Sequence, residues 1–190
     1  MSSALIPGSF DPITLGHLDI ITRAAARFDK VTVAVMTNDM QKYVQGAPVK
    51  QYAFTMSERR AMAEAACAHL PNVEVIAAGG MLIKLFDCVE ADFIIKGVRN
   101  TTDFEYEQKH ALFNRAHDSR AETLYMPADP AFDGISSTLA RARMKRGESL
   151  EGILPDAVIA WINAHPRACL YLYMFGGKQL CPRTIALRPA

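Results

Sequence analysis

The sequence lacks the features that mark several common protein classes. Its 190 residues carry a net charge of only +1, so no overall field draws the chain toward nucleic acid or an anionic membrane. No apolar run approaches the roughly 20 residues that a membrane-spanning helix needs, and no basic segment followed by a long apolar stretch marks a secretory signal. We therefore expect a cytoplasmic protein that binds neither nucleic acid nor membrane.

Cysteines are few, and their spacing does not suggest a metal or disulfide framework. The four are Cys67, Cys88, Cys169 and Cys181, and no two of them form a C-x-x-C pair. Cys67 and Cys88 fall within apolar helical patterns, so we expect both to be core thiols. Internal repeats and low-complexity tracts are also lacking. With 50% hydrophobic residues, the chain can bury the core of a single domain.

What the chain does have is a regular alternation of strand and helix patterns. Short apolar or β-branched runs typical of buried strands occur at 5–6, 31–36, 73–76, 93–95 and 123–126. Helical patterns begin near Gly16, at a Thr55–Glu58 capping box, at Met81, at an Asp103 cap, at a cap on Ser136 or Ser137, and at Pro155. This order predicts an α/β fold with a doubly wound, parallel five-stranded sheet and helices on both faces.

In such a sheet, ligands bind beyond the carboxyl ends of the strands, where the strand order reverses. This rule brings together the loops after Ile6, Met36 and Ile95. We expect one domain over residues 1–164, ending with the last helix near Ala164. Residues 165–190 form a C-terminal extension of unknown role, in which 170–175 is apolar.

The segment Leu5–Ile21 is the most informative of these loops. A short strand ends at Pro7-Gly8, a turn-rich stretch follows, and a helix begins near Gly16. The first amides of a helix lack partners within it, and the helix dipole favours negative charge there, so the arrangement forms an anion site. Gly16 permits close approach to the backbone, and His17 and Ser9 can donate to phosphoryl oxygens. Taken alone, the segment also fits an ordinary turn with a solvated histidine.

Two later segments suit phosphate as well. Lys96 and Arg99 flank Gly97 at the end of the fourth strand, where two cations can hold an anion, although a solvated basic turn is the alternative. Three hydroxyl residues, 136–138, begin a helix whose free amides suit a triphosphate tail. A simple N-terminal cap explains those hydroxyls equally well in isolation.

Together these segments resemble a known group of enzymes over roughly residues 4–162. Thr14-Leu15-Gly16-His17 resembles the T/H-x-G-H signature of the nucleotidyltransferase superfamily, and 135–141 resembles its I-S-S-x-x-x-[RK] motif. The stretch 96–107 resembles the R-G-x-R-x-x-x-D-F-E-Y-E segment of the phosphopantetheine adenylyltransferase family, and this is the most family-specific match. The resemblance implies a Rossmann-like domain.

The resemblance also implies an activity, ligands and an assembly. Members of this family transfer the adenylyl group of ATP to 4′-phosphopantetheine, giving dephospho-coenzyme A and pyrophosphate, the penultimate step of coenzyme A synthesis. Mg²⁺ is expected to travel on the nucleotide phosphates without protein ligands. A homohexamer and feedback by coenzyme A or dephospho-coenzyme A are further implications of the family.

Residue roles follow from the same resemblance. The implied catalytic residues are His17, Lys42 and Arg99. Those implied to bind ATP are Ser9, Phe10, Gly16, His17, Gly97, Arg99, Glu107, Ser136, Ser137 and Thr138, with assistance from Arg141. Those implied to bind phosphopantetheine are Ser9, Lys42, Met81, Leu82 and Lys96, and Tyr106 and Asn114 complete the pockets. Asp11 is interpreted as a turn-former rather than a general base.

The chain departs from the family pattern at three places. Ser9 replaces the usual Thr, and Lys96 replaces an Arg implied to grip the acceptor phosphate, which keeps the charge but loses the bidentate fork. In the long loop after the second strand, Gln41 takes the position of a family Lys, so Lys42 is our choice and Lys50 the alternative.

Two other functions remain open at this point. One is a different adenylyl- or cytidylyltransferase of the same superfamily. The other is a catalytically weak nucleotide-binding regulatory module, for which Lys96, Gln41 and the long loop are the support.

Overall fold

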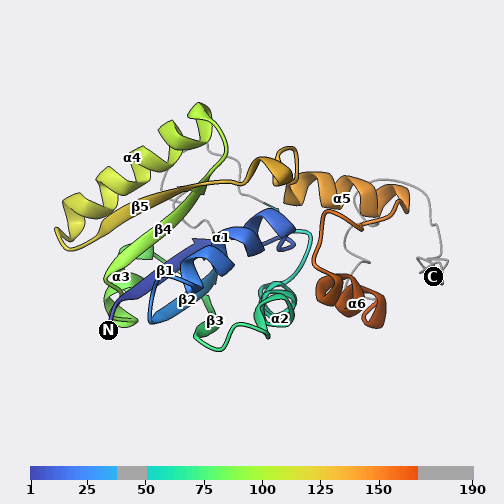
Figure 1. Ribbon diagram of the computed structural model, residues 1–190, viewed down its shortest axis with the longest axis horizontal. Coiled ribbons are helices and arrows are strands. Elements are labelled where there is room, and N and C mark those ends of the chain that lie inside the picture. Colours follow the sequence, from blue (N-terminus) through green and yellow to red (C-terminus); the bar gives the residue numbers. More distant parts are fainter. Residues whose placement is uncertain (38–50, 167–190) are drawn as a thin grey trace.

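The computed structural model describes residues 1–37 and 51–166, and its centre is a parallel sheet with the order β3-β2-β1-β4-β5 (Figure 1). The strands are β1 (Ser3–Gly8), β2 (Lys30–Met36), β3 (Val73–Ala78), β4 (Phe93–Val98) and β5 (Glu122–Pro127). β1 pairs with β2 from Ser3↔Lys30 to Gly8↔Val35, and with β4 at Ala4↔Phe93 and Leu5↔Ile94. The predicted α/β fold with five parallel strands is confirmed.

Helices connect the strands at the positions that the periodicity predicts. They are α1 (Leu15–Ala25), α2 (Met56–Cys67), α3 (Leu82–Cys88), α4 (Thr101–His117), α5 (Ser137–Arg146) and α6 (Asp156–Ala164), with a short 3₁₀ turn at Pro130–Phe132. The predicted capping box is present at α2, where Thr55 accepts from Glu58 N and Glu58 accepts from Thr55 N. Ser136 caps α5 and Pro155 precedes α6, as expected.

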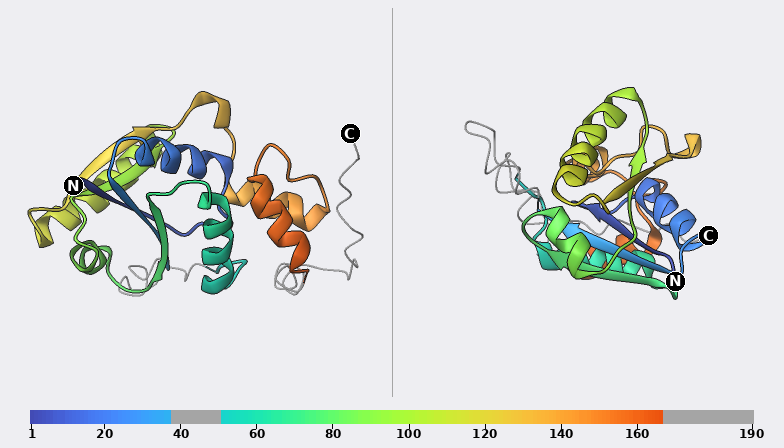
Figure 2. Two further views of the ribbon diagram at one scale, coloured as in Figure 1. Left: turned by 60° about the horizontal axis from the view of Figure 1, so that its bottom comes forward. Right: turned by 90° about the vertical axis from the view of Figure 1, so that its left-hand side faces the viewer.

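Two layers of apolar contacts cover the sheet, one on each face. Along β1, Ala4 and Ile6 belong to a cluster with α1 and α2, whereas Leu5 belongs to a cluster with α3. This alternation is the period of a strand, and burial on both faces is typical of parallel sheets. Figure 2 shows α1 and α3 on opposite sides of the twisted sheet, and α4 lies beside α3 and β4.

The strand order reverses between β1 and β4. From β1 the chain proceeds outward to β2 and β3, then returns to the other side of β1 as β4 and β5. The loops after β1 and β4 therefore diverge over opposite faces and leave a crevice at their carboxyl ends. Gly97 in β4 permits close packing of α1 there, since a Cβ on it would lie 3.0 Å from Ile20 Cγ1.

The carboxyl-terminal helices close this end of the molecule. α5 and α6 lie beyond the sheet, and α6 packs against α2 (Figure 1). The segment between them also fixes the start of α1, because Leu15 N donates to Ile153 O at 2.9 Å. Val158 and Ile162 of α6 join the same apolar cluster as α1 and α2.

Two local predictions are wrong. Asn100, not Asp103, caps α4: the Asn100 side chain accepts from Asp103 N at 2.9 Å, and this starts the helix three residues earlier. Of the two expected core thiols, Cys67 is buried, which raises its pKa to about 11, but Cys88 is exposed at the end of the short helix α3.

Among the helices of the described ranges, none is both long and apolar enough to cross a membrane.

Candidate active site

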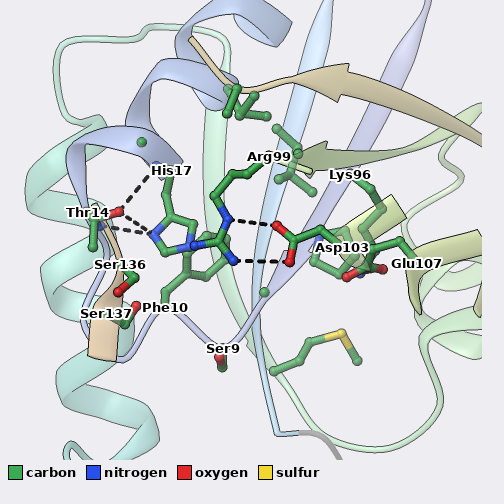
Figure 3. A pocket seen from close by; sticks show the side chains of 18 of the residues that line it. Ser9, Phe10, Thr14, His17, Lys96, Arg99, Asp103, Glu107, Ser136 and Ser137 are labelled. Carbon is green, nitrogen blue, oxygen red and sulfur yellow. Dashed lines mark hydrogen bonds and ion pairs between the residues drawn. The ribbon is translucent and has the colours of Figure 1, made fainter. Parts of the chain in front are cut away.

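A pocket of about 570 Å³ lies at the carboxyl ends of β1 and β4, where the strand order reverses. Its walls come from the β1–α1 loop, the end of β2, the β4–α4 segment and the start of α5. Figure 3 shows side chains from these separate segments directed into one space. The location is the one that the strand order predicts for a ligand.

The β1–α1 loop folds back on itself at Phe10. This residue has a left-handed backbone with φ 43°, and its buried ring covers Gly8, where an added Cβ would lie only 2.7 Å from the ring. The ring then meets the His17 imidazole edge to face, with centroids 5.2 Å apart. Gly8 and Phe10 therefore fix the position of His17 at the pocket.

The spacing of Thr14 and His17 is that of a helix cap. Thr14 precedes α1, its side chain accepts from His17 N at 3.4 Å, and Thr14 N donates to His17 Nδ1 at 3.1 Å. Histidine thus takes the place that Glu or Gln holds in an ordinary capping box. Because a backbone N–H only donates, Nδ1 is the acceptor and the neutral ring carries its proton on Nε2. The motif holds a hydrogen-bond donor at the pocket in a fixed tautomer.

Gly16, between those two residues, also lines the pocket. A Cβ there would meet only ordinary contacts, 3.6 Å from Phe132 Cβ and 3.9 Å from Thr14 Oγ1. Packing within the chain therefore does not require glycine at this position. The expectation that Gly16 serves the approach of a ligand to the backbone stays a prediction.

Both cations at the end of β4 are paired with carboxylates of α4. Arg99 donates from Nε and Nη2 to Asp103 at 2.7 and 3.2 Å, and this bond raises the Arg99 pKa further. Lys96 Nζ lies 2.9 Å from Glu107 Oε2, and both side chains are about one-fifth exposed or less. Asp103 and Glu107 are four residues apart and share one face of the helix. Both cations are therefore already paired with carboxylates before an anion enters the pocket.

A histidine that the sequence analysis did not single out lies beside the Lys96–Glu107 pair. His110 lines the pocket, and its ring lies 4.5 Å from the ring of Tyr106. Burial lowers the pKa of His110, Glu107 raises it, and Lys96 lowers it again. The net direction is downward, which favours the neutral imidazole in the pocket.

The start of α5 brings three hydroxyl residues to the opposite wall. Ser136 Oγ accepts from Leu139 N at 3.1 Å, which leaves its own proton to donate. Ser137 Oγ donates to Pro12 O at 2.8 Å and so joins α5 to the β1–α1 loop. Thr138 Oγ1 accepts from Arg141 Nη2 at 3.2 Å. The helix N-terminus behind them presents amides to an anion.

Arg141 and Asp11 also hold the start of α5 against the β1–α1 loop. Arg141 Nη1 donates to the backbone carbonyl of Asp11 at 2.6 Å, so in this state it braces the loop. The Asp11 carboxylate is 1% exposed and accepts from Ala53 N and Phe54 N, both at 3.0 Å. Asp11 does not line the pocket, which agrees with its interpretation as a structural residue.

The pocket brings together most of the predicted site residues. Those that line it are Ser9, Phe10, Gly16, His17, Leu82, Lys96, Gly97, Arg99, Tyr106, Glu107, Ser136, Ser137, Thr138 and Arg141. Met81 is not among the lining residues and packs against the α3 cluster, and Asn114 is buried away from the pocket. Gln41, Lys42 and Lys50 lie outside the described residues.

Carboxylates of the pocket are not arranged as metal ligands. In the part of the chain that the structure describes, no group of three or more His, Cys, Asp or Glu side chains could hold a metal ion. Asp103 and Glu107, the acidic residues that line the pocket, are engaged by Arg99 and Lys96.

Known proteins resemble this chain over most of its length. Residues 5–143 match the family described as cytidylyltransferase-like. A phosphopantetheine adenylyltransferase of Limosilactobacillus reuteri is 41% identical over 155 residues, which cover 82% of this chain and 84% of that protein. Proteins of the same name from Limosilactobacillus fermentum and Symbiobacterium thermophilum are each 42% identical over 155 residues, covering 84% and 90% of their lengths.

Proposed function

The chain belongs to the phosphopantetheine adenylyltransferase family of cytidylyltransferase-like enzymes, and we propose that it transfers the adenylyl group of ATP to 4′-phosphopantetheine. The products are dephospho-coenzyme A and pyrophosphate, in the penultimate step of coenzyme A synthesis. Alternative acceptors within the wider family are less well supported, because the relatives at 41–42% identity share one name.

One observation carries this proposal: His17 and the start of α5 line the same pocket. The two segments are more than a hundred residues apart, yet Ser137 Oγ bonds directly to Pro12 O in the loop that leads to His17. A triphosphate spanning the two helix N-termini would meet an imidazole donor at one end and amides with hydroxyls at the other.

The reaction needs no protein base. The acceptor phosphate is already ionised, so one of its oxygens attacks the α-phosphorus while the bond from that phosphorus to the β-phosphate oxygen breaks. The electron pair leaves with pyrophosphate, and no proton has to be removed from the nucleophile. The protein therefore aligns two anions and stabilises the charge that develops on the equatorial and leaving oxygens.

Each donor then has a separate position along the phosphates. His17 donates from Nε2 to the α-phosphate, where negative charge grows in the transition state. Arg99, the Ser136 and Thr138 hydroxyls and the amides of 136–138 hold the β- and γ-phosphates and receive the leaving group, while the Ser137 hydroxyl stays on Pro12 O. Ser9 and Lys96 hold the acceptor phosphate, with Lys42 bridging, and Leu82 lies along the pantetheine arm. Phe10 completes the nucleotide end, and Met81, which packs against the α3 cluster outside the pocket lining, supports the acceptor end from behind.

In this scheme, Glu107 is the partner of Lys96 before substrate binds. Its carboxylate holds Lys96 at 2.9 Å before substrate arrives. A dianionic phosphate offers Lys96 a stronger partner, so binding of the acceptor exchanges one ion pair for another. The pairing of Arg99 with Asp103 suggests the same exchange at the nucleotide.

Mg²⁺ accompanies the nucleotide in this proposal and is held by phosphate oxygens. Asp103 and Glu107 are the acidic residues that line the pocket, and two carboxylates are too few to enclose a metal, which favours phosphate oxygens as its ligands. When bound, the ion supplies neutralisation of the triphosphate charge. A homohexamer and feedback by coenzyme A or dephospho-coenzyme A are further parts of the proposal that come from the family. A cytoplasmic location and a domain that ends near Ala164 are parts that come from the sequence pattern.

The test is an assay of the purified chain with ATP, Mg²⁺ and 4′-phosphopantetheine, in which pyrophosphate and dephospho-coenzyme A are both quantified. CTP in place of ATP, and nicotinate mononucleotide in place of phosphopantetheine, form the comparison panel. Equal amounts of both products, only with ATP and phosphopantetheine, support the proposal. Turnover of another pair indicates a different transferase, and tight ATP binding without pyrophosphate release indicates a regulatory module.

A further inference from the structure

A buried arginine lies directly beneath the pocket. Arg59 in α2 is 1% exposed and is among the largest fully buried side chains of the described residues. It does not line the pocket, and its neighbour Arg60 is exposed and pairs with Glu64 in the ordinary way of a surface helix. Charged side chains are rarely buried to this extent unless they are paired.

The Arg59 guanidinium joins the loop after β1 to the carboxyl end of β2. A single nitrogen, Nη1, donates to the backbone carbonyl of Ser9 at 2.5 Å and to that of Met36 at 3.0 Å. Ser9 belongs to the loop after β1, and Met36 is the last residue of β2. One charged group therefore sets the spacing between the β1–α1 loop and the carboxyl end of β2.

The surroundings of the guanidinium hold it in one orientation. Its Cζ lies 4.2 Å from the centroid of the Tyr52 ring, which stacks over the charged plane. The carboxylate of Asp11 contributes an opposing charge nearby, while burial lowers the pKa of the guanidinium. Asp11 is itself fixed by the amides of Ala53 and Phe54, which lead into α2. Charged side chains of α2 and of the β1–α1 loop thus hold these two segments together beneath the site.

Stability alone does not account for this arrangement. The Nε of Arg59 is buried without a hydrogen-bond partner among the described residues, so the burial of the cation is incompletely compensated. Replacing a buried ion by an apolar side chain of similar volume is often neutral or stabilising. A geometric requirement at Ser9 and Met36 explains the arginine better than a need for core stability.

We propose that Arg59 is a positioning residue of this active site, which fixes Ser9 and the carboxyl end of β2 relative to each other. The inference rests on the proposed adenylyl transfer, in which Ser9 holds the acceptor phosphate and, by the family resemblance, also contacts ATP. Without Nη1, the two carbonyls lose their common donor, and Ser9 and the end of β2 move apart. The reacting phosphates are then misaligned, although every group that touches them is still present.

Three variants test the proposal against a matched control. Arg59→Met removes the donors and keeps much of the volume, Arg59→Lys keeps the charge but ends one bond short of Nη1, and Arg59→Ala leaves a hole of guanidinium shape. Arg60→Met is the control from the same helix. We expect kcat per folded molecule to fall about 10- to 100-fold in Arg59→Met, because small misplacements remote from the chemistry have effects of this size. Arg59→Lys should fall between this variant and the wild type, and Arg60→Met should equal the wild type.

Chemical rescue separates positioning from a merely structural role. Guanidinium at millimolar concentration should restore part of the kcat of Arg59→Ala and leave Arg60→Met unchanged, in assays well below each variant's Tm. The proposal is overturned by a folded Arg59→Met or Arg59→Ala variant with kcat and both KM values within about twofold of the wild type, or by an Arg59→Ala variant that folds and is not rescued. Should Arg59→Met and Arg59→Ala both fail to fold, Arg59→Lys decides by the same criterion.

The proposed function is tested separately in the same series. A wild-type chain that yields no dephospho-coenzyme A contradicts the function and not the role of Arg59. Calorimetric titration with ATP, which requires no turnover, then supplies the readout: weaker ATP binding in Arg59→Met than in Arg60→Met supports positioning, and equal binding refutes it.

Discussion

Replacement of His17 separates two roles that the structure assigns to one side chain. His17→Ala removes the Nε2 donor from the pocket and also removes the acceptor for Thr14 N at 3.1 Å. Loss of one preorganised donor to a developing oxyanion typically costs about 10²- to 10³-fold in kcat. Loss of the cap and of the edge-to-face contact with Phe10 should lower the free energy of unfolding by about 1–2 kcal/mol.

His17→Gln is the informative partner of that variant. Gln is an ordinary residue at this position of a capping box, where its Oε1 accepts from Thr14 N. The unfolding free energy should therefore stay near the wild-type value. The amide turned toward Thr14 does not replace Nε2, so kcat should fall about as far as in His17→Ala, at least 10²-fold.

The measurements are initial rates of pyrophosphate release at saturating substrates, together with urea unfolding of each variant. His117→Ala, on the exposed end of α4, is the control and should change neither quantity. Near-normal turnover in His17→Ala would remove the imidazole from the mechanism. Full activity in His17→Gln with loss in His17→Ala would show that the cap, not the donor, is what matters.

Four further predictions concern other walls of the pocket. Lys96→Ala should raise the KM for phosphopantetheine more than that for ATP in steady-state kinetics; equal rises would contradict its assignment. Glu107→Gln releases Lys96 from its pair and should lower the KM for phosphopantetheine; an unchanged or higher KM would show that the carboxylate orients Lys96 instead. Burial lowers the pKa of His110 from 6.5, so its contribution to stability is complete above pH 6.5 and is lost as the pH falls below that value. His110→Gln should therefore reduce the loss of unfolding free energy on the acid side of pH 6.5, as measured by urea unfolding. An identical loss in the variant would contradict this role of His110. Gly97→Ala should lower the unfolding free energy by about 1–3 kcal/mol, because its Cβ meets Ile20 at 3.0 Å; an unchanged Tm would show that α1 shifts freely.

The order of strands and helices is predictable from the sequence because its signals are local. Buried parallel strands appear as apolar runs, and a capping box such as Thr55–Glu58 lies within four residues. Where several residues of similar chemistry adjoin, local signals do not choose between them. Asn100 and Asp103 both suit a cap, and only the structure shows that Asp103 is occupied by Arg99.

Most of the predicted site residues line one pocket, but the ion pairs that they form with one another could not be predicted from the sequence. Glu107 was predicted for the nucleotide and Lys96 for the acceptor, yet the two form one ion pair across the pocket wall. Arg59 gives no signal at all, because an arginine in an amphipathic helix is normally exposed. Its partners lie 50 and 23 residues away in sequence, and they are backbone carbonyls that carry no residue identity.

The central claim is that the β1–α1 loop and the start of α5 hold one triphosphate between them. A crystal structure with a non-hydrolysable ATP analogue and Mg²⁺ tests it most directly. We expect the α-phosphate within hydrogen-bond distance of His17 Nε2, and the β- or γ-phosphate within that distance of the Ser137 or Thr138 amide, in the same bound molecule. A nucleotide that contacts one of these segments and not the other would contradict the account.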